Sequence, residues 1–544
     1  MTKLINALLN PSIYDHAVDK IELVETHISW VLLTGDFAYK IKKPVNFGFL
    51  DFSSLEKRQY YCEEELRLNR RFAPQLYLDV ITITGTEDQP SINGKGEVLE
   101  YAVKMKQFPS ESLLSTKLDS GDLREAHMDW LAQVIADFHQ KANIAKAKSK
   151  FGTLEAIAQP VSENIQQIRH QIQEPDILLQ LDSIEKWSKT AFKRLYPELR
   201  KRKQEGYIRE CHGDLHLGNI IQLHEKIIPF DCLEFNENLR WIDVLSEIAF
   251  LVMDLDDHQR TDLARRLLNK YLEHTGDYRN LAVLQYYMVY RAMVRAKVNA
   301  LRLNQDGLAQ QEIDSIHNEC KSYITLGNLY ITDRKPVLII MHGFSGSGKT
   351  TISQFILEAS PVIRIRSDIE RKRLYKDQLP DSSDAGKNLN TQSAINEGIY
   401  NRESSSMTYN HLRMLAEDII LAGMSVIVDA AFLQAEQRQQ FSQLASMLDV
   451  PFRIIDCHAE HSILKQRISE RQNHGGDASD ATLDVLFHQQ ENHDPLTEEE
   501  ISQSFSIDKT DASSIKTVTD HLLALMHGHA APDSFSDNEI LKHT

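Results

Sequence analysis

Gly343-Phe344-Ser345-Gly346-Ser347-Gly348-Lys349-Thr350 is the stretch that decides the fold of the C-terminal part of this 544-residue chain. It matches the pattern G-x-x-x-x-G-K-[ST] at every fixed position. The apolar run 337–341 precedes it and a helical pattern over 351–358 follows it, which is the strand–loop–helix context that the pattern requires. We therefore predict a nucleoside triphosphate site, with a chance glycine-rich turn as the alternative.

The chemistry of this loop comes from its backbone and from two side chains. Its glycines allow the backbone amides to wrap a phosphate chain at the positive end of the following helix. Lys349 is expected to reach the β and γ phosphates, and the Thr350 hydroxyl is expected to join the ligands of Mg²⁺. The predicted nucleotide-binding residues are Gly343, Ser345, Gly346, Ser347, Gly348, Lys349, Thr350 and Thr351.

Acidic residues end two further strand-like runs in this part of the chain. Apolar runs alternate with helical patterns, which favours a parallel sheet. Asp429 ends the run 425–428, where a carboxylate is suited to hold Mg²⁺ through water. Asp368 follows the run 362–365 and is expected to orient or deprotonate an acceptor hydroxyl. The alternatives are a strand-terminal cap for Asp429 and a helix N-cap for Asp368.

Arg467 and Arg471 are four residues apart in a helical pattern, ahead of His474-Gly-Gly-Asp477. Two arginines on one helix face beside a glycine hinge predict a lid that closes over phosphates during catalysis. A solvated charged face is the competing interpretation. Residues from about 335 to 525 resemble the P-loop kinases of the AAA-like small-kinase group, which includes polynucleotide, gluconate and shikimate kinases. The motif does not choose between phosphorylation of a small molecule and hydrolysis of ATP.

A second cluster of polar residues lies at His212-Gly-Asp-Leu-His-Leu-Gly-Asn-Ile220, followed by Asp231 at the end of a short apolar run. Asp214 is expected to accept the proton of an acceptor hydroxyl, and Asn219 and Asp231 are expected to hold Mg²⁺ on the phosphates of ATP. A polar loop with ordinary Asx turns is the alternative.

This second cluster resembles the signature of aminoglycoside phosphotransferase-like enzymes, a branch of the protein-kinase-like fold, and the resemblance spans roughly residues 20 to 330. Leu217 departs from the usual proline, and Asp231-Cys232-Leu233 replaces D-F-G. The resemblance implies a strand lysine that contacts the nucleotide phosphates and a helix glutamate that fixes it.

Two lysines and two glutamates compete for these roles. Lys40 aligns with the strand lysine, but Lys42 lies on the same strand face, so the choice between them stays open. Glu65 is favoured over Glu64 because it shares a helical face with Leu68 and Phe72. A solvated charged helix is the alternative. The first hairpin, 28–42, has no glycine-rich phosphate loop.

The pattern along the chain predicts an α/β multidomain protein with a C-terminal P-loop NTPase whose parallel sheet is flanked by helices. The resemblance at 20–330 implies an N-terminal protein-kinase-like fold of two lobes. We expect a strand-rich small lobe at 1–109 and a helical lobe with the catalytic loop at 110–332. A P-loop kinase or NTPase domain is expected at 333–526 and a flexible tail at 527–544.

Composition limits the class of protein. With 42% hydrophobic and 26% charged residues the chain has material for folded cores, and no window is apolar enough for a membrane span. The five cysteines lack C-x-x-C spacing, which disfavours a zinc site and favours the reducing cytoplasm. The net charge is −17, and the residues from 336 on hold 18 Lys+Arg against 30 Asp+Glu. This acidity disfavours nucleic acid and anionic membranes as partners.

The order of the two halves resembles a bacterial family described as bifunctional aminoglycoside phosphotransferase/ATP-binding proteins. We therefore predict an ATP- and Mg²⁺-dependent phosphotransferase with two nucleotide sites, which transfers the γ-phosphate to a hydroxyl of a small aminoglycoside- or sugar-like acceptor. Two alternatives stay open: the C-terminal half is a polynucleotide or nucleoside kinase, or one half is a nucleotide-sensing regulatory module.

Overall fold

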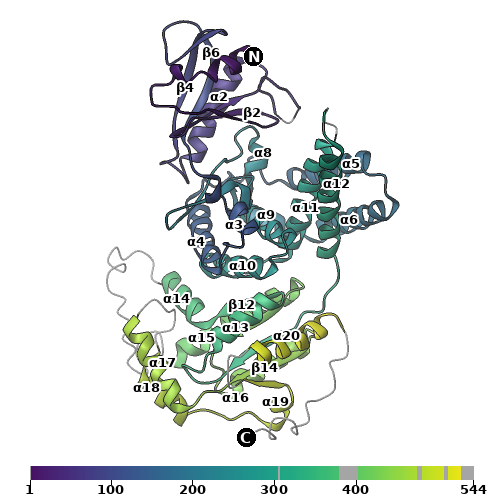
Figure 1. Ribbon diagram of the computed structural model, residues 1–544. Coiled ribbons are helices and arrows are strands. Elements are labelled where there is room, and N and C mark those ends of the chain that lie inside the picture. Colours follow the sequence, from purple (N-terminus) through teal and green to yellow (C-terminus); the bar gives the residue numbers. More distant parts are fainter. Residues whose placement is uncertain are drawn as a thin grey trace. The chain divides into compact units, whose positions relative to one another are not determined.

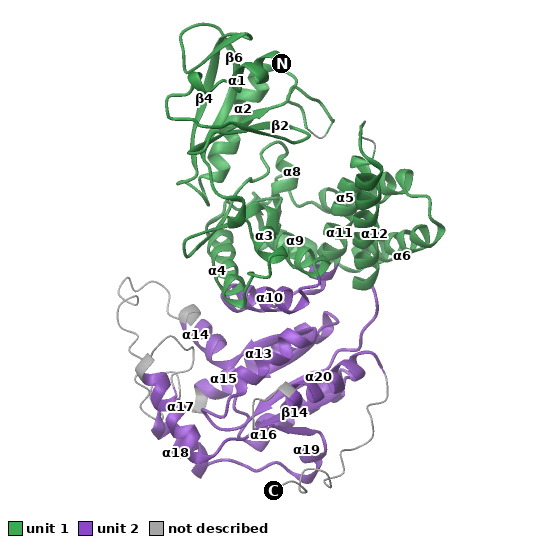
Figure 2. Ribbon diagram, viewed as in Figure 1, with its two compact units in different colours: residues 1–258, 286–330 green, residues 259–285, 331–544 purple. Residues whose placement is uncertain are grey.

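The computed structural model of the chain describes residues 2–48, 50–303, 307–378, 402–474, 481–507 and 512–528. Contacts divide the chain into two units (Figure 1, Figure 2). Unit 1 comprises residues 1–258 and 286–330, and unit 2 comprises residues 259–285 and 331–544. Among the described residues, no helix has the length and apolar character that a membrane crossing requires.

Unit 1 begins with an antiparallel sheet of six strands in the order β1-β2-β3-β6-β4-β5. The predicted hairpin is confirmed, since β2 and β3 pair in the register Leu33↔Ala38 on either side of the turn. The strands are β1 (Glu22–Glu25), β2 (Ser29–Leu33), β3 (Phe37–Lys42), β4 (Tyr77–Thr86), β5 (Gln89–Ile92) and β6 (Val98–Lys106).

Helix α2 (Leu55–Asn69) lies against this sheet (Figure 1). It begins where the side chain of Ser54 accepts a hydrogen bond from the Lys57 amide, at 3.3 Å. Its buried face includes Cys62, Glu65 and Leu68. The face predicted from the spacing of Glu65 and Leu68 is therefore the one that the helix buries.

The rest of unit 1 is mostly helical. Helix α9 is its centre, because every residue from 244 to 255 is buried. Short strands β7 (Ile208–Glu210), β8 (Ile220–Leu223), β9 (Lys226–Pro229) and β10 (Trp241–Asp243) frame the 212–219 loop. The helices are α1 (Thr2–Leu8), α3 (Leu114–Asp119), α4 (Glu125–Lys141), α5 (Leu154–Gln171), α6 (Pro175–Arg194), α7 (Tyr196–Gln204), α8 (Glu237–Arg240), α9 (Val244–Asp257), α11 (Ala282–Arg302) and α12 (Gln310–Tyr330).

Unit 2 is built on a parallel sheet of five strands in the order β12-β13-β11-β14-β15. The predicted fold class is thus confirmed. The strands are β11 (Leu338–His342), β12 (Val362–Arg366), β13 (Ser425–Asp429), β14 (Phe452–Cys457) and β15 (Ser504–Ile507). The helices are α10 (Thr261–Thr275), α13 (Lys349–Ala359), α14 (Ser367–Gln378), α15 (Arg402–Leu421), α16 (Ala435–Met447), α17 (His461–His474), α18 (Leu483–Glu491), α19 (Glu498–Ser502) and α20 (Ala512–Met526).

Helix α10 is where the structure differs from the predicted ranges. The sequence assigns it to the helical lobe at 110–332, but its apolar face packs on α13 and β12 of unit 2 (Figure 2). An amphipathic pattern shows that a helix covers an apolar surface without showing which surface it covers. The tail predicted at 527–544 lies outside the described residues, apart from 527 and 528.

A buried ion pair at the start of α9 yields a test of stability in unit 1. Arg202 donates to both oxygens of Asp243 at 2.7 and 2.8 Å, and Asp243 also caps α9 through the Leu245 amide. Asp243→Asn keeps a capping oxygen but leaves the fully buried guanidinium without its counter-charge. We expect a loss of about 3–5 kcal/mol in the free energy of unfolding.

Differential scanning calorimetry would report this loss as a fall of roughly 10 °C in the melting temperature of the affected transition. The control is Glu205→Gln, which breaks an exposed 3.9 Å pair with Lys201 and should cost less than about 1 kcal/mol. Equal falls in the melting temperature of the two variants would contradict a stabilising role for the pair of Arg202 and Asp243.

Candidate active sites

The loop between β7 and β8 is held in place by its own backbone and by buried side chains. His212 Nε2 lies 2.8 Å from the carbonyl oxygen of Phe230, and the Gly213 amide donates to Glu247 Oε1 at 2.8 Å. Gly213 has a φ of +92°, and a Cβ there would lie 3.0 Å from the Leu239 carbonyl oxygen. The loop therefore requires glycine at this position.

The support behind this loop was not predicted from the sequence. Glu247 on α9 contacts His139 on α4 at 2.8 Å, and Arg291 on α11 donates to the Gly213 carbonyl at 3.3 Å. One atom each of His139, Cys211 and Glu247 could bind a metal ion, and these atoms lie within 4.8 Å of one another. Both oxygens of Glu247 already accept hydrogen bonds, so bracing the loop is sufficient reason for this group to be buried.

Asp214 and Asn219 are joined directly. Asn219 Nδ2 donates to the Asp214 carbonyl at 3.0 Å and to its carboxylate at 3.1 Å. The Asn219 carbonyl in turn accepts from the amide of Phe230 at 2.9 Å, the residue before Asp231. The structure therefore brings the three predicted residues of the 212–231 segment into one connected group.

The environment of Asp214 keeps it ionised. Burial opposes its charge, but His216, 3.6 Å away, together with His212 and Arg295, holds the pKa of Asp214 well below its usual range. Burial also opposes charge on His216, yet the Asp214 carboxylate raises the pKa of that imidazole. Asp214 is therefore deprotonated at neutral pH, which is the protonation state that a general base has before it accepts a proton.

Lys40 and Lys42 on β3 both reach the carboxylate of Glu65, at 2.8 and 2.6 Å. Lys40 also pairs with Asp231, and Lys42 with Glu234. Glu234 was not predicted from the sequence, although it lies three residues after Asp231. Burial opposes the charge of Glu65, but the two lysines lower the pKa of Glu65 to about 2.

The two lysines differ in their surroundings. Lys42 is 1% exposed and its partner Glu234 is 4% exposed, whereas the Asp231 side chain that Lys40 contacts is 38% exposed. Asp231 has a φ of +62°, and its amide donates a hydrogen bond to the Tyr77 hydroxyl oxygen at 3.0 Å. Lys40 thus faces the accessible acid, while Lys42 lies in the interior.

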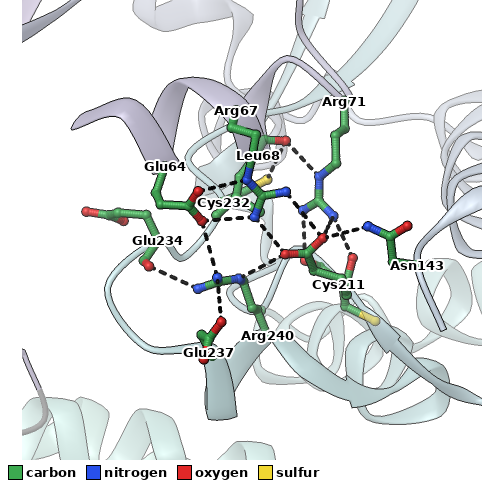
Figure 3. Close-up of polar contacts among 12 residues, drawn as sticks. Glu64, Arg67, Leu68, Arg71, Asn143, Cys211, Cys232, Glu234, Glu237 and Arg240 are labelled. Atoms are coloured by element: carbon green, nitrogen blue, oxygen red, sulfur yellow. Dashed lines mark hydrogen bonds and ion pairs between the residues drawn. The ribbon is translucent and has the colours of Figure 1, made fainter. Parts of the chain in front are cut away.

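A cluster of charged side chains joins α2 to the base of the 212–219 loop (Figure 3). Arg67 donates to Glu210 Oε1 at 2.8 Å, and Arg71 donates to the Glu210 and Cys211 carbonyls at 2.7 and 3.0 Å. Arg240 reaches Glu210 at 3.4 Å and the Glu234 carbonyl at 3.0 Å. The helix that carries Glu65 is therefore tied to the segment that carries Asp214.

The 343–350 loop of unit 2 runs from β11 into α13, as predicted. Lys349 Nζ donates to the carbonyls of Gly343 and Phe344 at 2.8 and 2.7 Å. Gly346 has a φ of +84°, and a Cβ there would lie 3.0 Å from the Leu464 carbonyl oxygen of α17. Ser347 is buried and its Oγ has no protein partner. The loop has the backbone shape of a phosphate cradle.

Other predicted residues gather around this loop. Asp429 at the end of β13 accepts from Ser353 Oγ on α13 at 3.3 Å, and Arg366 Nε lies 3.8 Å from it. Asp368 is the second residue of α14, and its carboxylate lies 4.0 Å from Arg371. Thr350 and Thr351 are exposed in the first turn of α13.

The two arginines of the predicted lid lie on α17. Arg467 donates to the Gly346 carbonyl at 3.1 Å, which brings it to the loop. The positive charge of Arg471 acts on Lys349, whose pKa is lowered chiefly by burial. The glycines of the predicted hinge lie outside the described residues.

Comparisons with known protein families match two regions of the chain. Residues 51–284 match the model of the phosphotransferase enzyme family, and residues 338–496 match an AAA domain. The chain joins a phosphotransferase-family domain to an AAA domain. It is a kinase-type phosphotransferase, and the predicted order of its two domains is confirmed.

An uncharacterized protein of Mycobacterium tuberculosis is similar to this chain, with 29% identity over 470 residues that cover 86% of the chain and 88% of the relative. An amicoumacin kinase structure with AMP-PNP, Ca²⁺ and its ligand shares 12% identity at a TM-score of 0.38, over 60% of this chain and 92% of that one. A gluconokinase of Sinorhizobium meliloti shares 17% identity at a TM-score of 0.24, over 35% of this chain and 97% of that one.

The two lysines of the phosphotransferase-family domain can be separated by substitution. Lys42→Met leaves Glu234 buried without its cation, so we expect a loss of about 3–5 kcal/mol in the free energy of unfolding. Lys40→Met leaves Glu65 paired with Lys42, so the fold should change less while first-site phosphotransfer falls at least ~10²-fold. Thermal unfolding and turnover measured on both variants would test this, and the reverse ranking would contradict it.

The pair of His216 and Asp214 predicts a pH dependence of stability. A histidine whose folded pKa is raised stabilises the protein fully below its unfolded pKa of about 6.5, and this contribution is lost as pH rises through the folded value. His216→Asn should therefore lower the melting temperature more at about pH 6 than at about pH 9. His170→Asn, at an exposed position on α5, is the control. An equal deficit at both pH values would contradict the pairing.

Proposed function

We propose that the chain is an ATP- and Mg²⁺-dependent phosphotransferase with two nucleotide sites, each of which transfers the γ-phosphate to a hydroxyl of a small molecule. The first site comprises Lys40, Glu65, Asp214, Asn219 and Asp231. The P-loop site comprises 343–351, Asp368, Asp429, Arg467 and Arg471. The observation that supports this most strongly is the continuous chain of contacts from Glu65 through Lys40 to Asp231.

In the first site each side chain has a role that suits its surroundings. Asp214, held ionised, accepts the proton of the acceptor hydroxyl. Lys40, fixed by Glu65, contacts the α and β phosphates. Asn219 donates through Nδ2 to Asp214, which leaves its Oδ1 for a cation that Asp231 shares. Carboxylate and amide oxygens are ligands that Mg²⁺ accepts, so the donor set fits this ion.

In the P-loop site the backbone does most of the binding. The amides of the loop and the N-terminus of α13 hold the phosphates, and Lys349 exchanges its loop carbonyls for the β and γ oxygens. Thr350 and Asp429 would hold Mg²⁺, which when bound neutralises charge on the phosphates. Asp368 orients the acceptor hydroxyl, and Arg467 and Arg471 cover the phosphates from α17.

The acceptor of both sites is a small hydroxyl-bearing molecule, with aminoglycosides and sugars as the first classes to try. The acidity of the residues from 336 on disfavours a polynucleotide in the P-loop site, because a phosphate polymer needs a basic channel. A cytoplasmic location is likewise our expectation, from the cysteine pattern.

Asp214→Ala and Lys349→Ala, made singly, test whether two sites exist. Each should remove a distinct component of labelled-phosphate transfer from ATP by about 10²–10⁴-fold, because one loses a base and the other a phosphate-binding cation. The acceptor panel comprises aminoglycosides, sugars, nucleosides and 5′-hydroxyl oligonucleotides. Asp137→Ala and Lys516→Ala, at exposed positions on α4 and α20, are the matched controls.

Two results would contradict the proposal. If Asp214→Ala changes transfer to no acceptor that the parent phosphorylates, the first site is wrongly assigned. If the double variant with Asp214→Ala and Lys349→Ala turns over ATP as fast as Asp214→Ala alone, catalysis at the P-loop site is excluded.

A further inference from the structure

Helix α10 has an unusual place in the molecule. It lies inside the region that matches the phosphotransferase family, 51–284, yet it packs in unit 2 with the P-loop site (Figure 2). The chain leaves unit 1 after residue 258, forms α10, and returns to unit 1 at residue 286. Residues 259–285 therefore interrupt unit 1 in the sequence but pack as part of unit 2.

The segment covers an open edge of the parallel sheet. Strand β12 lies at one edge of the sheet, and Asn269 on α10 contacts two of its backbone groups. The Arg364 amide donates to Asn269 Oδ1 at 2.7 Å, and Asn269 Nδ2 donates to the Val362 carbonyl at 3.2 Å. Asn269 is 2% exposed, so this side chain substitutes for a neighbouring strand at a position closed to water.

Four residues further along α10, Glu273 accepts two hydrogen bonds from Arg364, at 2.7 and 3.2 Å. Arg366 also lies 3.8 Å from this carboxylate. Glu273 and Arg364 are each 2% exposed. Burial opposes the charge of Glu273, but Arg364, Lys270 and Arg366 lower the pKa of Glu273 to about 2, so it is ionised at neutral pH.

The two arginines carry this contact on to the P-loop site. Arg364 donates to the Thr350 carbonyl at 3.3 Å and to Ser353 Oγ at 3.2 Å. Ser353 Oγ contacts Asp429 at 3.3 Å, and Arg366 lies 3.8 Å from the same carboxylate. Glu273 is thus linked to the residues that would hold Mg²⁺, Thr350 and Asp429.

Helix α10 also contacts the C-terminal end of α13. Arg265 donates to the Glu358 carbonyl at 2.9 Å, and Arg266 pairs with the Glu358 carboxylate at 2.7 Å. Helix α13 begins at Lys349. Helix α10 contacts the last turn of α13 directly, and Arg364 links α10 to the first turn of α13. Contacts with α10 therefore fix the position of α13, the helix that follows the phosphate loop.

We propose that residues 259–285 complete the P-loop site, and that Glu273 is a positioning residue which holds Thr350 and Asp429 through Arg364 and Arg366. This rests on the proposed function of the P-loop site. Glu273 fixes the arginine side chains, and these fix the loop end of α13 and the strand-end acid. Neutralising Glu273 frees both arginines to pair with Asp429, which competes with Mg²⁺ for that carboxylate.

The test uses the full chain with Asp214→Ala, so that turnover of ATP reports the P-loop site alone. Glu273→Gln should raise the Mg²⁺ concentration for half-maximal turnover ~10-fold or more, as loss of a residue behind a metal ligand does. The KM for ATP at saturating Mg²⁺ should change less than about twofold, because the phosphate loop itself is intact. Glu436→Gln, at an exposed position in the first turn of α16, is the matched control.

Glu273→Asp covers the case in which the glutamine variant does not fold, because it keeps the charge and shortens the side chain by one methylene. It should give a smaller rise in the half-saturating Mg²⁺ concentration. Equal Mg²⁺ dependence in Glu273→Asp, Glu436→Gln and the parent would overturn the inference, whatever the fate of Glu273→Gln.

Hydrogen–deuterium exchange supplies an independent measurement. A non-hydrolysable ATP analogue with Mg²⁺ should slow exchange in peptides from 261–275, and Lys349→Ala should abolish this protection. Unchanged exchange in α10 beside Lys349-dependent turnover would overturn the inference and leave the proposed function standing. No Lys349-dependent turnover at all would overturn both.

Discussion

The buried carboxylate of Glu65, shared between Lys40 and Lys42, is the interaction on which the first site depends. Each ion costs several kcal/mol to remove from water, so each must have a fixed partner. Lys40 and Lys42 come from β3, Glu65 from α2, and their further partners Asp231 and Glu234 from the segment after β9. Satisfying these charges therefore fixes the small-lobe sheet, its helix and the Asp231 turn against one another within unit 1.

Unit 2 meets the same constraint in another fold. Arg364 is buried on β12, and its counter-charge, Glu273, comes from a helix that lies 91 residues earlier in the sequence. In both units a cation paired with a buried glutamate also lies beside an acid of the candidate site: Lys40 pairs with Asp231, and Arg366 lies 3.8 Å from Asp429. The buried glutamate holds the cation in place, and the cation in turn holds the acid of the site in the absence of nucleotide.

The features that could be predicted are those written in contiguous sequence. Residues that are neighbours in the sequence specify the loop at 343–350, the loop at 212–220 and the hairpin of β2 and β3. Helical spacing specifies Glu65. Glu234 and Glu247 were missed because their partners, Lys42 and Gly213, lie 192 and 34 residues away. No local pattern marks such residues, since only the tertiary fold shows that an acid is buried beside a cation. The spacing also could not separate Lys40 from Lys42, because both point to the same carboxylate.

The placement of α10 changes what counts as a domain in this chain. A fragment over 333–526 contains the phosphate loop and the whole parallel sheet, but it lacks Asn269 and Glu273. Its edge strand β12 would lose the side chain that satisfies the Arg364 amide and the Val362 carbonyl, and Arg364 itself would lose its counter-charge. An uncovered edge and a bare guanidinium are both costly, and an uncovered edge invites pairing with another chain. The physical boundary of the P-loop unit is therefore discontinuous, and it includes a helix that the family comparison assigns to the other domain.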